Sequence, residues 1–342
     1  MFITVIVFLS LSLFLCATAV WLVCWVVARI AHHVMPFAPF AYTGLAIIGL
    51  FLLVILYGYY LGRFQLRVQP TTYASARVPA AFDGYKIVQI SDLHLLSMTP
   101  EFVQRVVDEI LQQQPDLICF TGDFVGFGVE EAKPFTDILL QLHAPDGIMS
   151  VLGNHDFALY HHGLSDEQKE DKVNQLTAYQ RDVLGWKLLR NQSWVIARGS
   201  DTLQIIGVDN ASCQGQGFQT VNRADLPQAM QSVLPSSPIA HSQSPFQILL
   251  SHDPSHWRAE VVPTTDIPLT LSGHTHAGQV RIFGYPLSSL MFKESQGWYE
   301  QDGQSLYINT GIGCTVPFRI GVPAEITVIT LNSQLSTLNS QL

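Results

Sequence analysis

The first 65 residues of this chain contain no aspartate, glutamate or lysine, and Arg29 and Arg63 are their only formal charges. Charged residues make up 13% of the 342 residues and hydrophobic ones 48%, which excludes a disordered protein. Residues 66–342 therefore hold all 27 acidic side chains and 16 of the 18 basic ones, a net charge of −11. This balance offers no basic field to a phosphate backbone. It disfavours duplex nucleic acid as a partner, and no protein partner is predicted.

Cysteine is also scarce, with five residues and no C-x-x-C spacing. Cys16 and Cys24 lie in the apolar leader, which leaves an odd number in the rest of the chain: Cys119, Cys213 and Cys314. This usage excludes a disulfide scaffold and a zinc ribbon. It indicates free thiols in a reducing compartment.

Two uncharged stretches, residues 1–28 and 34–62, each exceed the roughly 20 apolar residues that a helix needs to cross a membrane. Pro36 and Pro39 separate them. We therefore expect residues 1–65 to form a hairpin of two transmembrane helices in the cell (inner) membrane. The alternative is a signal peptide followed by one anchor. A signal peptide begins with a basic region, and nothing basic precedes Arg29.

A hairpin leaves the N-terminus and the C-terminal domain on the same side of the membrane. Three arginines, Arg63, Arg67 and Arg77, follow the second stretch, whereas Arg29 alone lies in the turn. Because basic residues concentrate in cytoplasmic segments, the C-terminal domain is expected in the cytoplasm.

The rest of the chain is predicted to have three parts. Residues 66–82 are expected to form a linker that passes into a first edge strand, residues 83–331 one layered α/β domain, and residues 332–342 a polar tail. The first half alternates strands with helices, which predicts a parallel sheet with right-handed crossovers. The predicted strands of this half are 85–91, 117–120 and 148–152, and its helices begin at Thr99 and Pro134.

The second half begins with a polar helix at 168–183 and then consists mainly of strands, so it is expected to be richer in antiparallel pairs. Its predicted strands are 193–196, 203–208, 246–250, 267–271, 279–283, 305–309 and 325–331.

Five short motifs follow one another, each at the end of a predicted strand, and open α/β sheets bind ligands at such ends. Aspartate and histidine are ligands for borderline divalent metals, and asparagine adds a neutral oxygen. Each motif alone is a weak signal, because it can be a structural turn or a structural histidine. The ordered set favours a site for two metal ions. Two metals that lie roughly 3.5–4 Å apart can clamp a phosphoryl group between them. The motifs are Asp92-Leu93-His94, Gly122-Asp123, Gly153-Asn154-His155-Asp156, Ser251-His252 and Gly273-His274-Thr275-His276.

As a set, these motifs resemble the calcineurin-like metallophosphoesterases, whose pattern is D-x-H, G-D, G-N-H-[DE], H and G-H-x-H. The segments LLSHDP, SGHTHAGQ and YINTGIGCTVPFR resemble the membrane-anchored subgroup of YaeI- and YkuE-like phosphodiesterases, which includes some UDP-2,3-diacylglucosamine pyrophosphatases. The resemblance implies an α/β fold, a four-layer α-β-β-α sandwich, which the transmembrane hairpin would precede.

The resemblance also implies a role for each motif residue. His155 would be the catalytic general acid, or would stabilise charge in the transition state, and Asp156 would support its loop. Seven ligands would hold two divalent ions such as Mn, Fe or Zn: Asp92, His94 and His276 the first ion, Asp123 both, and Asn154, His252 and His274 the second.

The leading hypothesis is a membrane-anchored dinuclear-metal phosphohydrolase. A metal-bound hydroxide would cleave a phosphodiester or pyrophosphate bond of a phosphate-ester substrate, which could be lipid-linked, such as UDP-2,3-diacylglucosamine. One alternative is a non-catalytic membrane scaffold with a vestigial metal site, although none of the seven ligands has been lost. A broad-specificity phosphoesterase or nuclease is another, and the acidic balance disfavours the nuclease.

Further side chains could contribute to a substrate site. His161 and His162 follow the third motif and either touch substrate or lie in an exposed loop. Arg319 either meets a substrate phosphate or forms a salt bridge. Three aromatic residues either line an acyl chain or belong to the core: Trp257, Phe292 and Trp298.

Overall fold

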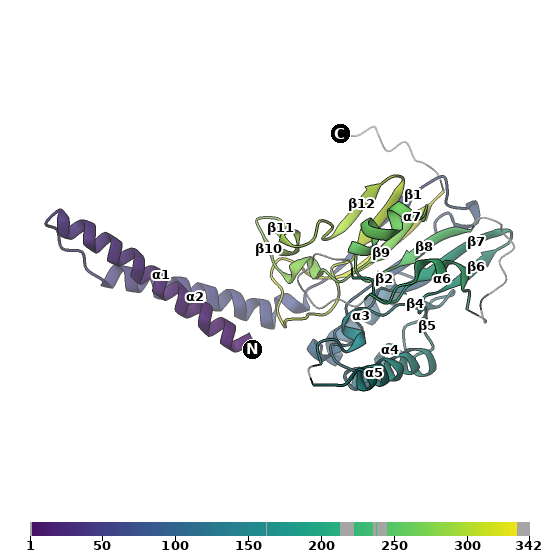
Figure 1. The fold of residues 1–342 in the computed structure, drawn as a ribbon, viewed down its shortest axis with the longest axis horizontal. Helices are drawn as coiled ribbons and strands as arrows, with labels where there is room; N and C mark the ends of the chain where they lie inside the picture. Colours follow the sequence, from purple (N-terminus) through teal and green to yellow (C-terminus); the bar gives the residue numbers. More distant parts are fainter. Residues whose placement is uncertain (1, 162, 213–221, 235–236, 238–244, 334–342) are drawn as a thin grey trace. The chain divides into compact units, whose positions relative to one another are not determined.

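The computed structural model describes residues 2–161, 163–212, 222–234, 237 and 245–333. Cys213, His162 and residues 334–342 of the predicted tail lie outside the described residues. The chain divides into two compact units (Figure 1). The helical unit comprises residues 1–63 and 316–320, and the α/β unit comprises 64–315 and 321–342.

The helical unit contains the predicted pair of apolar helices, which is confirmed. Helices α1 (Phe2–Ile30) and α2 (Ala38–Tyr60) are each long and apolar enough to cross a membrane. Pro39 lies in the first turn of α2, where its missing N–H breaks no helical hydrogen bond. Near the other end of α2, the backbone N–H of Arg319 donates to the carbonyl oxygen of Gly58 over 3.2 Å.

The first sheet of the α/β unit has six strands, and its neighbours β2, β3 and β4 are parallel, as predicted. Strand β14 runs antiparallel to β2. The strand order is β1 (Leu66–Ala74), β14 (Ala324–Asn332), β2 (Lys86–Ile90), β3 (Leu117–Phe120), β4 (Ile148–Ser150) and β5 (Lys187–Leu188).

The second sheet also has six strands, with antiparallel pairs at both edges and parallel pairs between them. Two antiparallel pairs here, against one in the first sheet, agree with the expectation for the second half. The strand order is β12 (Gly297–Gln301), β13 (Gln304–Ile308), β9 (Leu269–Ser272), β8 (Phe246–Leu250), β7 (Asp201–Gly207) and β6 (Gln192–Arg198).

Alternating side chains of each sheet enter two different cores, because successive strand residues point to opposite faces. Ile87 of β2 and Ile248 of β8 share the core between the two sheets. Val88 faces helices α3 (Pro100–Gln112), α4 (Thr136–Leu139) and α5 (Asp166–Ala178) on the outer face of the first sheet. Leu249 faces α6 (Leu226–Gln231), and Val262 of α7 (Val262–Thr264) packs against the same outer core. The predicted four-layer α-β-β-α sandwich is confirmed.

Two predicted segments differ from the observed structure. In the range predicted to be a linker that passes into a first edge strand, the edge strand comes first: residues 66–74 form β1, which pairs in parallel with β14. The strand predicted at 279–283 is instead a 3-10 turn, His276–Gln279, followed by the two-residue strand β10 (Arg281–Ile282). Positive φ angles at Gln279 and Phe283 interrupt the extended backbone there.

Candidate metal centre

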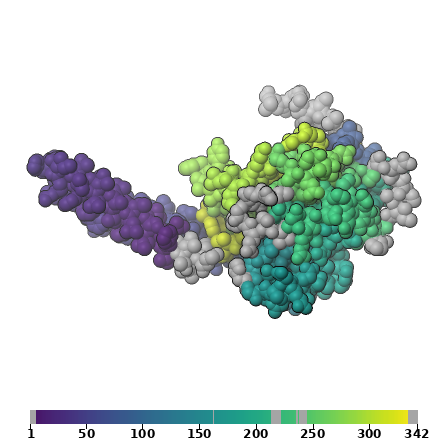
Figure 2. Space-filling model, viewed as in Figure 1, coloured from purple at the N-terminus to yellow at the C-terminus, as the bar shows by residue number. Residues whose placement is uncertain are grey.

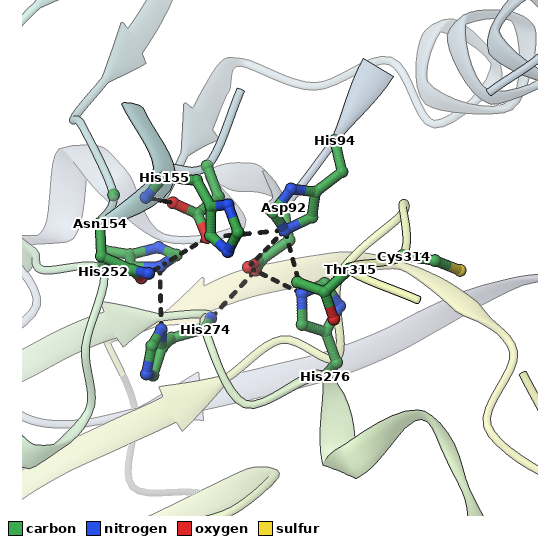
Figure 3. Close-up of polar contacts among 12 residues, drawn as sticks. Asp92, His94, Asn154, His155, His252, His274, His276, Cys314 and Thr315 are labelled. Atoms are coloured by element: carbon green, nitrogen blue, oxygen red, sulfur yellow. Dashed lines mark hydrogen bonds and ion pairs between the residues drawn. The ribbon is translucent and has the colours of Figure 1, made fainter. Parts of the chain in front are cut away.

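All five motifs follow strands of the two sheets, and their side chains meet at the carboxyl ends of the parallel strands (Figure 3). The first sheet supplies the segments after β2, β3 and β4, and the second supplies those after β8 and β9. Adjacent parallel strands end at the same edge of a sheet, so this convergence follows from the topology.

One group of ligand atoms is formed by Asp92, His94 and His276. The Nε2 atoms of the two histidines are 3.2 Å apart. Asp92 Oδ1 lies 3.3 Å from Nε2 of His276 and 4.0 Å from Nε2 of His94. Three donor atoms from two sheets therefore face a common point.

A second group surrounds Nε2 of His252. This nitrogen lies 3.1 Å from Oδ1 of Asn154 and 3.2 Å from Nδ1 of His274. His252 is fully buried, and its Nδ1 faces the carbonyl oxygen of Thr121 at 2.8 Å. A proton on Nδ1 would donate to this carbonyl and leave Nε2 as the ligand atom.

Asp123 lies between the two groups. Its Oδ2 is 3.5 Å from Nε2 of His94 and 3.2 Å from Nε2 of His252. Its Oδ1 accepts the backbone N–H of His155 over 2.9 Å. The carboxylate is buried and fixed by this hydrogen bond, with one oxygen directed at both groups.

The donor set fits divalent metal ions. Asp92 Oδ1 is buried and has no hydrogen-bond partner within the described part of the chain. A buried carboxylate oxygen without a partner is costly, and a cation would compensate it. Asn154 donates from Nδ2 to the hydroxyl of Tyr160 over 3.1 Å, which leaves its oxygen for the centre.

The electrostatics of the centre favour the neutral, metal-binding form of two histidines, His94 and His274, but not of His252. Burial, reinforced by the nearby His155, lowers the pKa of His94 well below its ordinary value. Burial also lowers the pKa of His274. Burial alone would lower the pKa of His252, but Asp123 raises it to about 10. At pH 7 His94 and His274 are therefore neutral, which is the form that binds metals, and a metal at His252 would displace a proton.

The backbone of the centre is strained. A non-glycine residue in the left-handed region costs about 1–2 kcal/mol, and such residues cluster at functional sites. Asp92 is held there by two hydrogen bonds, from its N–H to the carbonyl of Gly122 at 2.8 Å and from the N–H of His274 to its Oδ2 at 3.0 Å. Five predicted ligands have positive φ: Asp92 (53°), His94 (42°), Asp123 (56°), His274 (72°) and His276 (48°).

Gly153 allows two of the motif loops to approach closely. A Cβ atom at this position would lie 2.2 Å from Oδ1 of Asp123 and 2.6 Å from its backbone nitrogen. Asp156 holds the same loops together, because it accepts hydrogen bonds from the backbone N–H groups of Gly153, Phe124 and Val125. A side chain at position 153 would push Asp123 from its place.

His155 lies at the rim of the centre and is half-buried. Its Nδ1 is 3.3 Å from the carbonyl oxygen of Gly126, and its ring lies 4.4 Å from that of Tyr160 and 4.7 Å from that of His94. With His94 and Asp123 it also forms a group of possible ligands, so distance alone does not separate a catalytic role from ligation.

Sequence reasoning missed two residues of the centre. Tyr160 contacts both Asn154 and His155, and it lies outside every motif. Asp253 is fully buried next to His252, with its Oδ2 3.8 Å from Nε2 of His274. Its place in the segment LLSHDP was the available signal for it.

The further candidates lie in different environments. Phe292 contacts the ring of His274 at 5.5 Å. Trp257 is fully buried in the outer core of the second sheet, so it does not line a substrate site. Trp298 donates from Nε1 to Thr71. Arg319 is fully buried and belongs to the helical unit. His161 lies against the ring of Phe127.

A two-sheet α/β sandwich that carries aspartate, histidine and asparagine ligands at its strand ends defines a class, the metal-dependent phosphoester hydrolases. The family model "Calcineurin-like phosphoesterase" matches residues 85–278, more than half of the chain. The chain belongs to the calcineurin-like phosphoesterase family, as its motifs predicted, and it is a metal-dependent phosphoric ester hydrolase.

Its relatives include one that is named as a transmembrane protein. It is 32% identical to "Uncharacterized metallophosphoesterase YkuE" of Bacillus subtilis, covering 81% of this chain and 90% of that protein. It is 27% identical to "UDP-2,3-diacylglucosamine pyrophosphatase LpxG" of Chlamydia trachomatis, over 77% of this chain and 88% of that protein. It is 26% identical to "Transmembrane protein with metallophosphoesterase domain" of Danio rerio, over 89% of this chain and 66% of that protein. With the two apolar helices, these relatives indicate membrane association.

Proposed function

We propose that the chain is a membrane-anchored dinuclear-metal phosphohydrolase that cleaves a phosphodiester or pyrophosphate bond. The position of Asp123 carries the proposal. Its Oδ2 lies 3.5 Å from one histidine nitrogen and 3.2 Å from another, and these nitrogens belong to two separate ligand groups. A carboxylate oxygen in this position suits a bridge between two cations. Two divalent ions there would neutralise phosphate oxygens and lower the pKa of a water.

Each ligand group supplies one site of this proposed centre. Both groups combine histidine nitrogens with an oxygen ligand, a set that suits borderline metals such as Mn, Fe or Zn. Asp123 would belong to both sites. The first site would consist of Asp92, His94 and His276, and the second of Asn154, His252 and His274.

His155 is proposed as the general acid. Its Nδ1 faces the carbonyl oxygen of Gly126 at 3.3 Å, so Nε2 is the nitrogen that can pass a proton to the leaving oxygen. The ring of Tyr160 packs against it and fixes its orientation. Asp156 would hold the loop, since it accepts three backbone hydrogen bonds.

The proposed substrate is lipid-linked, and UDP-2,3-diacylglucosamine is the candidate. The name of the chlamydial relative gives this compound as the substrate of that protein. The two apolar helices would hold the enzyme in the membrane in which a diacylated compound resides.

We place the α/β unit in the cytoplasm, with both helices crossing the cell membrane. Three arginines, Arg63, Arg67 and Arg77, follow α2, whereas Arg29 alone lies at the other ends of the helices, in the last turn of α1. This distribution supports the orientation. The described cysteines are free thiols, which also suits a reducing compartment. A reporter fused after Leu342 should be active if it requires the cytoplasm. Activity only of a reporter that requires export would reverse the orientation.

The function is tested with purified full-length protein. We expect about two metal ions per chain by elemental analysis, with turnover of bis(p-nitrophenyl) phosphate that a chelator abolishes and added metal restores. Hydrolysis of UDP-2,3-diacylglucosamine is the second measurement. Absence of both metal and turnover would favour a scaffold with a vestigial site. Turnover of the soluble ester without the nucleotide lipid would contradict the proposed substrate and leave the proposed chemistry in place.

A further inference from the structure

A run of large apolar side chains is exposed on the α/β unit next to the metal centre. Strands β10 and β11 (Tyr285–Pro286) form a short hairpin, and the 3-10 turn Leu287–Leu290 follows it. In Figure 2 the yellow-green atoms of this region project from the α/β unit. Phe283 is 97% exposed and Leu290 83%. Five exposed side chains make up what we call the apolar hairpin face: Ile282, Phe283, Tyr285, Leu290 and Met291.

The turn of this hairpin has an unusual residue at its tip. Phe283 and Gly284 both have positive φ, 49° and 87°, as in a type I′ turn. The neighbouring hairpin β12–β13 has the same geometry at Asp302 and Gly303, with φ of 54° and 75°. Aspartate is common at this position, whereas a bulky residue is a conformational outlier. Phe283 therefore strains the backbone, and its exposed ring gains no burial within the described chain.

The segment that carries the apolar hairpin face packs against the 3-10 turn that contains His276. The backbone N–H of Leu287 donates to the carbonyl of Val280 over 2.9 Å. A Cβ atom at Gly278 would lie 2.6 Å from the backbone nitrogen of Ser288, so the two 3-10 turns are in close contact. Phe292, one residue beyond the face, contacts the ring of His274. The position of the face is thus fixed relative to two candidate ligands.

The charged residues of the segment that carries the face are basic. No aspartate or glutamate occurs between residues 267 and 293. Arg281 is half-buried and Lys293 exposed at the two ends of the segment. The next acidic residue, Glu294, is buried and accepts a hydrogen bond from Nε of Arg258 over 2.8 Å. An exposed apolar surface with a basic margin is typical of elements that lie in a membrane interface.

We infer that the apolar hairpin face docks on a lipid bilayer. The same chain supplies two helices long and apolar enough to cross a membrane. Helix α2 ends at Tyr60 and β1 begins at Leu66, so the connecting residues span at most about 20 Å. A bilayer that holds α2 is therefore within reach of the α/β unit. Docking would hold the His274 and His276 turn at the lipid surface, a consequence for catalysis that rests on the proposed function.

Brominated lipids test the contact without any turnover. Full-length protein with Trp21 and Trp25 replaced by Phe is reconstituted in nanodiscs of ordinary or brominated phosphatidylcholine. A new tryptophan is then introduced as Phe283→Trp, and the emission that it adds over the parent is measured in each lipid. The matched control is Leu140→Trp, an exposed residue next to α4, which lies away from β10 and β11 in Figure 1.

We expect brominated lipid to remove added emission at position 283 and to leave it unchanged at position 140. Equal emission in both lipids at 283 would overturn the inference, as would equal losses at the two positions. If the emission at position 283 is the same in both lipids but changes with protein concentration, the face contacts a second copy of the chain instead. If the Phe283 variant is quenched but the protein hydrolyses no phosphoester, docking stands and the proposed function fails.

Discussion

The metal centre and the apolar hairpin face both contain non-glycine residues with left-handed backbone conformation. Most of these residues are buried in the metal centre, whereas the one in the hairpin face is exposed. Asp92 and Asp123 are buried, and backbone N–H groups of neighbouring loops donate to their carboxylates. Phe283 has a similar φ and is almost fully exposed. Strain in the centre is therefore offset inside the fold. Strain at Phe283 is not offset within the described chain, which is why we look for its compensation in a bilayer.

The two regions also differ in the space around their glycines. A Cβ atom at Gly153 would overlap Asp123, whereas nothing lies within 4 Å of the same atom at Gly284. Tight packing makes the centre sensitive to single atoms. The hairpin turn should respond only through its own backbone conformation.

The largest expected effect is at the bridge. Replacing Asp123 with Asn should lower the rate by more than about 10³-fold and reduce bound metal, because even a residue that only hydrogen-bonds to a ligand changes metal affinity or activity by about 10–100-fold. Elemental analysis and turnover of bis(p-nitrophenyl) phosphate measure both. Asp266→Asn, at a carboxylate that is 88% exposed, is the control and should change neither. Full activity with two metals per chain in the Asp123 variant would remove this residue from its proposed role.

The next effect separates chemistry from metal binding. His155→Ala should keep near-normal metal content and lose about 10²–10⁴-fold in rate, the usual contribution of a positioned acid. The loss should shrink for p-nitrophenolate esters, which need little protonation on leaving. Equal losses for good and poor leaving groups would favour stabilisation of transition-state charge. Loss of metal with activity would make His155 a ligand or a support.

A pair of alanine substitutions compares the two regions directly. Gly153→Ala should cost about 3 kcal/mol of unfolding free energy and lower metal content, because the new methyl group overlaps Asp123. Gly284→Ala should cost only about 1 kcal/mol, since left-handed backbone is its only penalty. Denaturant unfolding of the full-length protein in detergent measures both costs. Equal costs would show that packing does not distinguish the two regions.

The smallest effect is a stabilisation. Phe283→Asn should raise the unfolding free energy by about 1 kcal/mol in detergent, because asparagine tolerates the left-handed region that phenylalanine resists. The melting temperature should rise by roughly 2–4 °C. Asp302→Asn, at the corresponding position of the β12–β13 turn, should have almost no effect. A lower stability of the Phe283 variant would mean that the ring already has a partner within the protein.

The motifs indicated which side chains would converge, because each motif follows a strand whose pattern was clear. The buried run before Asp92 and the buried run before Asp123 became parallel neighbours β2 and β3, and the end of each strand fixes where its motif lies. An edge strand was predicted near β1 without bounds, because its partner, β14, lies more than 250 residues away in the chain. Tyr160 was missed for a similar reason, since its contacts depend on how its loop folds back onto His155.

The sequence by itself determined the family, the α/β class, the order of strands β2, β3 and β4, and the residue types available to metals, because these depend on local patterns of apolar and ligand side chains. Tertiary structure decided that Asp123 Oδ2 faces both histidine groups, since the two sheets must pack before His94 and His252 can approach it. It also decided that Phe283 is exposed. Residues 279–283 alternate like a strand, and only the left-handed turn at Phe283 shows that this ring points to no core.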